Sequence, residues 1–85
     1  MKPAVLRSLV AYDLKTERVH HEQELVDLDV AAAGRLLGSS AEDPELYDVY
    51  RVQVAEAGFF SSWLPSSYLF DFDLFDYFLE TRQEA

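Results

Sequence analysis

The sequence contains no cysteine, which excludes a disulfide scaffold, a thiolate zinc site and a cysteine nucleophile. Its three glycines, at positions 34, 38 and 58, do not form a glycine-rich loop that could cradle a phosphate. The motifs G-x-S-x-G and S-x-x-K are also absent, which removes the common settings of a serine nucleophile. Carboxylates are plentiful, but nothing in their spacing defines an acid and base pair across a cleft. We therefore expect that the protein is not an enzyme and needs no cofactor.

Long apolar runs are missing as well. Arg7 and Ser8 interrupt the first hydrophobic stretch before it reaches the length of a signal peptide. The longest stretch without a charged residue, 57–70, contains a glycine, a proline and four serines, which is unlike a membrane span. Together with the absence of cysteine, these features predict a cytoplasmic protein without a membrane partner.

Positive charge is scarce. The 85 residues include 7 Lys and Arg against 16 Asp and Glu, for a net charge of -9. Residues 1–40 carry a net charge of -1 and residues 41–85 carry -8. This balance is opposite to that of a direct nucleic-acid binder and would be repelled by an acidic membrane surface. A basic protein partner suits the charge, although solubility alone would also account for it.

The hydrophobic content is high enough for a folded domain: 49% of the residues are hydrophobic and 14% are aromatic. The length predicts a single domain over residues 1–85, with a frayed tail at 83–85. Residues 38–44 read as a loop because they are small, polar and end in proline.

Alternation of side chains predicts two strands over residues 4–14 and 18–25, joined as a hairpin by a short polar segment. Residues 28–37 have the spacing of a helix, with Asp27 or Asp29 as the N-terminal cap and Gly38 as the stop. Residues 46–52 alternate as a strand. Residues 53–64 favour a second helix that ends before Pro65, and a strand continuing through Val54 is the alternative.

Residues 68–82 alternate as a strand at first, but the pattern slips at 75–79, which predicts a bulge or a bend. A last strand is expected over 77–82. The fold class is therefore α+β, with a small antiparallel sheet of three to four strands and one or two helices on one face, in the approximate order ββαβαβ.

The two histidines lie together in the run His20-His21-Glu22, followed by Glu24. On a regular strand, His20, Glu22 and Glu24 share a face, and imidazole with carboxylates suits a transition metal. No third histidine or cysteine supports that reading, so we favour a solvated strand face and predict no metal site.

Residues 59–78 are rich in aromatic residues, include Asp71, Asp73 and Asp76, and contain no basic residue. The phenylalanines suit a core, but so many rings in a small domain predict that some lie at the surface. If residues 46–52 pair with the last strand, their acids and tyrosines extend the same face. Exposed aromatic rings beside carboxylates are typical of an interface for a basic partner. The candidate partner-binding residues are Asp48, Tyr50, Trp63, Tyr68, Asp71, Asp73 and Asp76.

Size, charge and four phrases of the sequence resemble the small acidic immunity proteins of bacterial polymorphic-toxin and contact-dependent inhibition systems. The phrases are YDLKTE from Tyr12, LLG from Leu36, YDVYRV from Tyr47 and DYFLE from Asp76. The resemblance implies a cognate toxin domain, basic and nuclease-like or deaminase-like, that is bound in the cytoplasm with its active site blocked.

A different class of function remains open: a small regulatory or assembly module that forms a homodimer or larger homo-oligomer through its aromatic C-terminal segment. An apolar strand edge would pair readily with its own copy.

Overall fold

A computed structural model of the chain describes residues 4–39 and 41–84. The elements, in chain order, are β1 (Ala4–Asp13), β2 (Val19–Glu24), α1 (Val30–Leu37), β3 (Tyr50–Val52), α2 (Val54–Phe60), the short 3-10 helix η1 (Ser61–Trp63) and β4 (Phe75–Glu84). In the part of the chain that is described, no helix has the length and apolarity needed to cross a bilayer.

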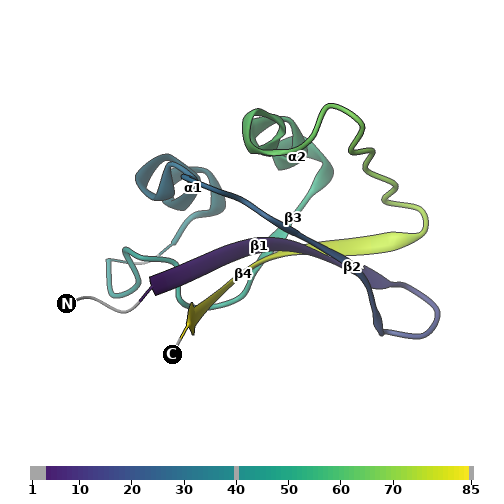
Figure 1. The fold of residues 1–85 in the computed structure, drawn as a ribbon, viewed down its shortest axis with the longest axis horizontal. Helices are drawn as coiled ribbons and strands as arrows, with labels where there is room; N and C mark the ends of the chain where they lie inside the picture. The colour runs from purple at the N-terminus through teal and green to yellow at the C-terminus, as the bar shows by residue number, and fades with distance from the viewer. Residues whose placement is uncertain (1–3, 40, 85) are drawn as a thin grey trace.

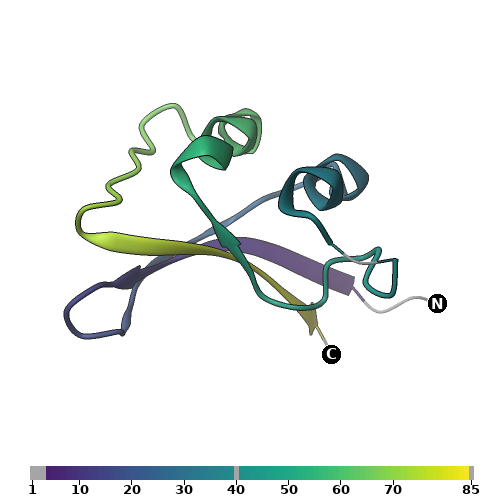
Figure 2. The same cartoon turned by 180° about the vertical axis from the view of Figure 1, so that it is seen from behind.

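The four strands form one antiparallel sheet in the order β2-β1-β4-β3. The long strands β1 and β4 run side by side through its centre, and β2 and β3 form the edges (Figures 1 and 2). The α+β class, the antiparallel sheet and the order ββαβαβ are confirmed. The strand after α1 pairs with the last strand, as the sequence suggested.

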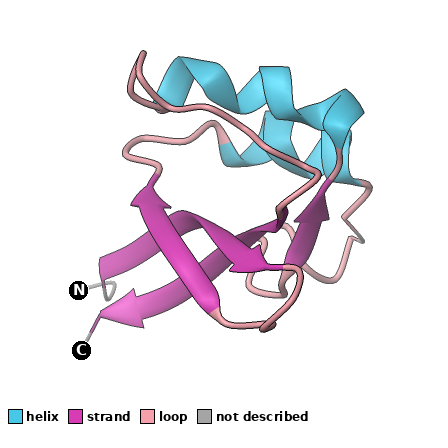
Figure 3. Ribbon diagram, turned by 90° about the vertical axis from the view of Figure 1, so that its right-hand side faces the viewer, coloured by secondary structure: helices cyan, strands magenta, loops and turns pink. Residues whose placement is uncertain are grey.

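Both helices lie on the same face of the sheet, and the other face carries no helix (Figure 3). The buried core lies between the helices and the sheet. Its fully buried large side chains are Leu9, Leu46, Val52, Phe60, Tyr77 and Leu79.

Helix α1 has the caps that its sequence predicts. The carboxylate of Asp29 accepts a hydrogen bond from the backbone N–H of Ala32, which satisfies one free donor of the first turn. Gly38 ends the helix at a φ of 71°, a conformation that favours glycine.

The strand predicted over residues 46–52 is wrong in its first half, because only Tyr50–Val52 is extended and paired. Leu46 has a φ of 58°, which turns the chain and buries its side chain in the core. The carboxylate of Asp43 then accepts hydrogen bonds from the backbone N–H groups of Tyr47 and Asp48. A carboxylate that satisfies these donors stabilises a loop in place of a strand.

The predicted extension of the last strand through residues 68–74 is also wrong. Residues 64–74 form a connection that covers the helix-bearing face of the sheet beside α2 (Figure 1). The carboxylate of Asp71 accepts hydrogen bonds from the backbone N–H groups of Asp73 and Leu74. The alternating residues of this segment therefore form a turn and not a strand. β4 begins at Phe75 and extends to Glu84, so Gln83 and Glu84, expected in a frayed tail, belong to the strand; Ala85 lies outside the described residues.

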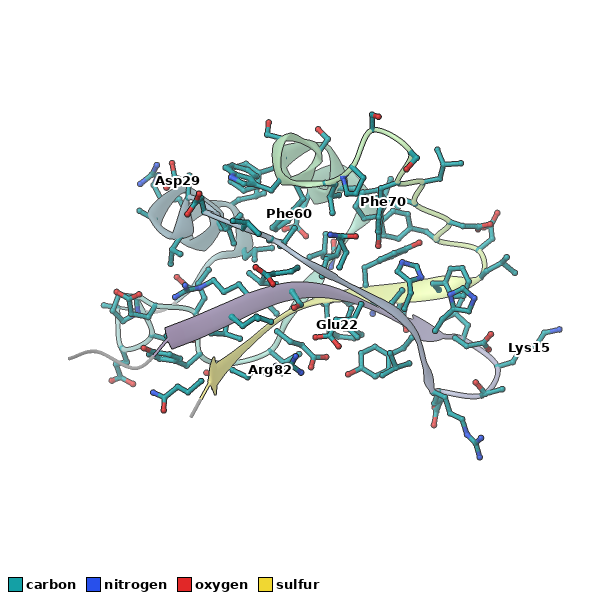
Figure 4. All side chains as sticks on the ribbon, viewed as in Figure 1. Lys15, Glu22, Asp29, Phe60, Phe70 and Arg82 are labelled. Atoms are coloured by element: carbon teal, nitrogen blue, oxygen red, sulfur yellow. The ribbon has the colours of Figure 1, made fainter. Side chains whose placement is uncertain are left out.

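Alternation along β4 divides its side chains between two surfaces. Tyr77 and Leu79 enter the core, whereas Asp76, Phe78 and Glu80 face the side without helices. Figure 4 shows the same division, with Phe60 and Phe70 on the helix-bearing side of the sheet and Glu22 and Arg82 on the other.

The burial predicts a large difference between two identical substitutions. Leu9 is fully buried, so Leu9→Ala should lower the free energy of unfolding by about 2–5 kcal/mol. Leu69 is 83% exposed, so Leu69→Ala should change it by less than about 0.5 kcal/mol. Urea denaturation followed by circular dichroism measures both, and equal losses would contradict this assignment of the core.

Candidate functional site

The register of the strands determines which side chains are neighbours on the sheet face without helices, which we call the open face. Tyr12 pairs with Asp76, Val10 with Phe78 and Ser8 with Glu80, across β1 and β4. Arg51 of β3 pairs with Phe78 on its other side. Polar and aromatic side chains therefore meet in adjacent rows on this open face.

Two aromatic rings cover the middle of the open face. The rings of Tyr12 and Phe78 meet edge to face, with centroids 5.5 Å apart. Beside them Val10 is 3% exposed and Ser8 is 2% exposed, although no helix lies over either residue. The open face therefore has an apolar layer of its own, built from side chains of the sheet.

A groove of about 410 Å³ lies next to these rings, and we call it the open-face groove. Its lining combines aromatic and aliphatic side chains with carboxylates from the hairpin and from β4. The lining residues are Tyr12, Asp13, Leu14, Glu17, Val49, Asp76, Phe78 and Glu80. Leu14 and Val49 are both exposed, so the groove has an apolar rim that nothing in the described chain covers.

The four acidic residues of the groove are held in different ways. The hydroxyl of Tyr12 donates a hydrogen bond to the carboxylate of Glu80. This hydrogen bond, together with burial, raises the pKa of Tyr12 to about 12. Asp76 accepts from Arg51, with 3.0 Å between Nη2 and Oδ1.

The β1–β2 turn supplies the remaining two acids. The carboxylate of Asp13 accepts from the backbone N–H groups of Lys15 and Thr16, and these hydrogen bonds lower its pKa. Glu17 has a φ of 60°, which closes the turn. The hairpin thus fixes one acidic wall of the groove.

This arrangement has the chemical groups that recognise a cation. Carboxylates in the lining attract positive charge, while the rings and aliphatic side chains can pack against an alkyl stem or a planar cation. Within residues 4–39 and 41–84, no three His, Asp or Glu side chains are grouped as ligands of a metal ion.

Of the residues that the sequence indicated, Asp76 lies in the open-face groove and Asp48 directly precedes Val49 of its rim. Tyr50 lies on the helix-bearing face of the sheet, because it pairs with Leu79, whose side chain lies in the core. Its hydroxyl donates to the Asp43 carboxylate at 2.5 Å, which raises the pKa of Tyr50 to about 12.

The other indicated residues lie on the helix-bearing side. Trp63 is half-buried, and its indole N–H donates to the carbonyl oxygen of Asp27 at 3.2 Å. Tyr68 is also half-buried against the core. Asp71 and Asp73 belong to the turn before β4, and both are exposed. The indicated residues are therefore divided between two faces and do not form one surface.

The expectation that some aromatic rings of residues 59–78 lie at the surface holds for Phe78, which is half-buried and lines the open-face groove. The other rings of that segment lie on the helix-bearing side and are buried or half-buried, because they pack on one another and on the core. Phe70 and Phe72 are stacked with centroids 5.5 Å apart. Tyr47 is the exposed aromatic side chain, at 50%, and it lies outside this segment.

The histidines do not share a face with the glutamates of β2. A register shift opposite Ala11 and Tyr12 makes His20 an extra residue in the ladder. The Nδ1 atoms of His20 and His21 are then 2.9 Å apart, and both rings contact Phe75. His21 Nε2 shares a hydrogen bond of 2.8 Å with the Tyr68 hydroxyl, which ties the 64–74 connection to the sheet.

Tyr12, Phe78 and Glu80 are central to the groove but were not among the candidates drawn from the sequence. Their phrases, YDLKTE and DYFLE, do contain an acid beside an aromatic residue. The missing information was the β1–β4 register, which brings the two phrases together although 68 positions separate Tyr12 from Glu80.

Residues 6–80 match the model of the family described as Domain of unknown function (DUF7683), and the chain belongs to that family. The matched range contains every residue of the open-face groove. No curated protein and no solved structure matches the chain.

The surroundings of His21 predict a loss of stability in mild acid. Burial, and then the charge of His20, lower the pKa of His21 below its usual value of about 6.5. The unfolded chain therefore takes up a proton more readily, so stability is complete above about pH 6.5 and declines as the pH falls toward the lowered pKa. Urea unfolding at several pH values between about 7.5 and 5.5 should show this decline, and His21→Gln should flatten it. An equal decline in the variant would contradict the assignment.

The Tyr12–Glu80 hydrogen bond predicts the titration of one tyrosine. Glu80→Gln should move the pKa of Tyr12 from about 12 toward its usual value of about 10, as measured by NMR of the ring carbon that bears the hydroxyl. Glu22→Gln is the matched control, because Glu22 makes the smallest of the contributions that raise this pKa. Equal shifts in both variants would mean that the hydrogen bond does not determine the titration.

Proposed function

We propose that the protein is an immunity-type binding protein: it binds a basic toxin domain in the cytoplasm and neutralises it by covering its active site. The binding surface in this proposal is the open face of the sheet. The net charge of -9 and the resemblance to small acidic immunity proteins support a basic partner.

The observation that carries the proposal is the composition of the open-face groove. Its apolar rim contains Leu14 and Val49, which are 44% and 60% exposed, beside a pair of packed aromatic rings. Four carboxylates, those of Asp13, Glu17, Asp76 and Glu80, lie in the same lining. Protein interfaces combine a buried aromatic or aliphatic anchor with a polar rim, and rim charges steer the approach of an oppositely charged partner.

The contact surface in the proposal extends from the groove to the acids at its borders. Asp76 is its central carboxylate and Asp48 lies next to its rim. Asp71 and Asp73, in the turn before β4 on the helix-bearing side, add negative charge outside this surface. Asp71 also accepts two backbone hydrogen bonds, so its replacement would disturb the turn as well as the charge.

Self-association through the aromatic C-terminal segment has less support. Phe70, Phe72 and Phe75 pack against the core, and β4 is an inner strand next to β1. Leu69 and Leu74 are the exposed apolar residues of that region. Sedimentation equilibrium tests this alternative directly, and a tight dimer broken by changing these two leucines would favour it.

Capture from a lysate of the source cell tests the proposal when it is done with matched baits. Asp76→Asn with Glu80→Gln should weaken capture of the partner about tenfold, because it removes two groove carboxylates. Asp27→Asn with Glu42→Gln removes the same charge outside the groove and should leave capture nearly unchanged. The captured protein should be basic, should kill cells when expressed alone, and should be harmless when co-expressed with the wild-type chain.

Two results would contradict the proposal. One is a partner whose capture falls equally with both double variants, since that would mean nonspecific charge attraction. The other is a partner that binds through the groove and has no toxic activity. In that case the proposed binding surface would be correct and the proposed immunity function would be wrong.

A further inference from the structure

We infer that the open-face groove receives a single arginine side chain of the partner, and that Arg51 of the protein itself occupies one of its carboxylates until the partner arrives. This inference rests on the proposed function and names the chemical group that the groove recognises.

Different residues of the groove suit the alkyl stem and the guanidinium group of an arginine side chain. Leu14 and Val49 provide apolar surface for the alkyl stem at the rim. Tyr12 and Phe78 provide aromatic rings next to which a guanidinium group is favourably placed. Asp76 provides an acceptor in the same lining.

The contact between Arg51 and Asp76 shows that a guanidinium group fits at this position. The Arg51 Nη2 atom lies 3.0 Å from Asp76 Oδ1 at the margin of the groove. The strand register explains this contact. Arg51 pairs with Phe78, and Asp76 lies two residues before Phe78 on the same face of β4.

This ion pair is placed where a partner could displace it. The Arg51 side chain is 61% exposed and the Asp76 side chain is 33% exposed. Exposed ion pairs contribute little to stability, so exchange of one guanidinium group for another has a small cost. Arg51 thus reduces the affinity of the groove for cations that lack further contacts with the open face.

Arginine fits this site better than lysine. A guanidinium group is planar, weakly hydrated and able to donate two parallel hydrogen bonds to one carboxylate while lying against an aromatic ring. An ammonium group is compact and strongly hydrated, so it gains less beside Tyr12 and Phe78.

The direct test is an NMR titration of the full chain with N-acetyl-arginine amide. N-acetyl-citrulline amide is the matched control, because it has nearly the same shape without the charge. The arginine probe should shift the signals of Tyr12, Asp76 and Phe78, and citrulline should shift them far less. The lysine analogue should bind more weakly than the arginine probe.

A pair of variants tests the role of Arg51. Arg51→Gln should tighten binding of the arginine probe about twofold to fivefold, by removing the competing guanidinium group. Arg82→Gln makes the same charge change on the same face, where Arg82 pairs with Glu22 at 3.5 Å, and should have little effect. In the background of Asp76→Asn, the gain from Arg51→Gln should disappear.

Three results would overturn the inference: absence of shifts in the groove, equal shifts with citrulline, or equal gains from Arg51→Gln and Arg82→Gln. These results are separate from failure of the proposed function. If capture of the toxic partner still depends on Asp76 and Glu80 while the arginine probe does not bind, the interface stands and the arginine contact is wrong.

Discussion

The antiparallel pairing of β1 with β4 is the constraint on which the rest of the structure depends. It extends over ten residues of each strand and joins the two ends of the chain. Side chains alternate along both strands, so one register assigns Leu9 and Tyr77 to the core and Tyr12 and Phe78 to the open face. A shift by one residue would exchange the two sets, burying carboxylates and exposing the core.

The two faces that result have different roles. One is covered by α1, α2 and the 64–74 connection, whose aromatic rings pack on Tyr77. The other has only its own side chains for cover, and there the Tyr12–Glu80 hydrogen bond and the Arg51–Asp76 ion pair lie beside an apolar rim. Four carboxylates and two exposed apolar side chains thus share one groove, and the proposal of a basic protein partner rests on this combination.

The sequence predicted the element order and most boundaries because those depend on local patterns. The caps Asp29 and Gly38 defined α1, and alternation defined the two arms of the hairpin. Local patterns failed where side chains satisfy backbone groups in loops. Asp43 and Asp71 each accept hydrogen bonds from backbone N–H groups in loops. The alternation of apolar and polar residues around them predicted strands that do not form.

Prediction of the site from sequence was limited for a different reason. The acidic and aromatic composition predicted a basic partner, and one of the candidate residues, Asp76, lies on the open side of the last strand. The opposing wall, Tyr12 and the acids of the β1–β2 turn, comes from the other end of the chain. Its contact with β4 is a property of the register, which no local pattern specifies.

The central claim is that the partner binds the open face and not the helix-bearing face. Methyl NMR of the chain in complex with its captured partner tests this claim most directly, because exposed methyl groups lie on different parts of the surface. The account predicts that the methyl signals of Leu14 and Val49 change on binding while those of Val54 and Leu69 do not. Changes at Val54 and Leu69 with none at Leu14 and Val49 would contradict it.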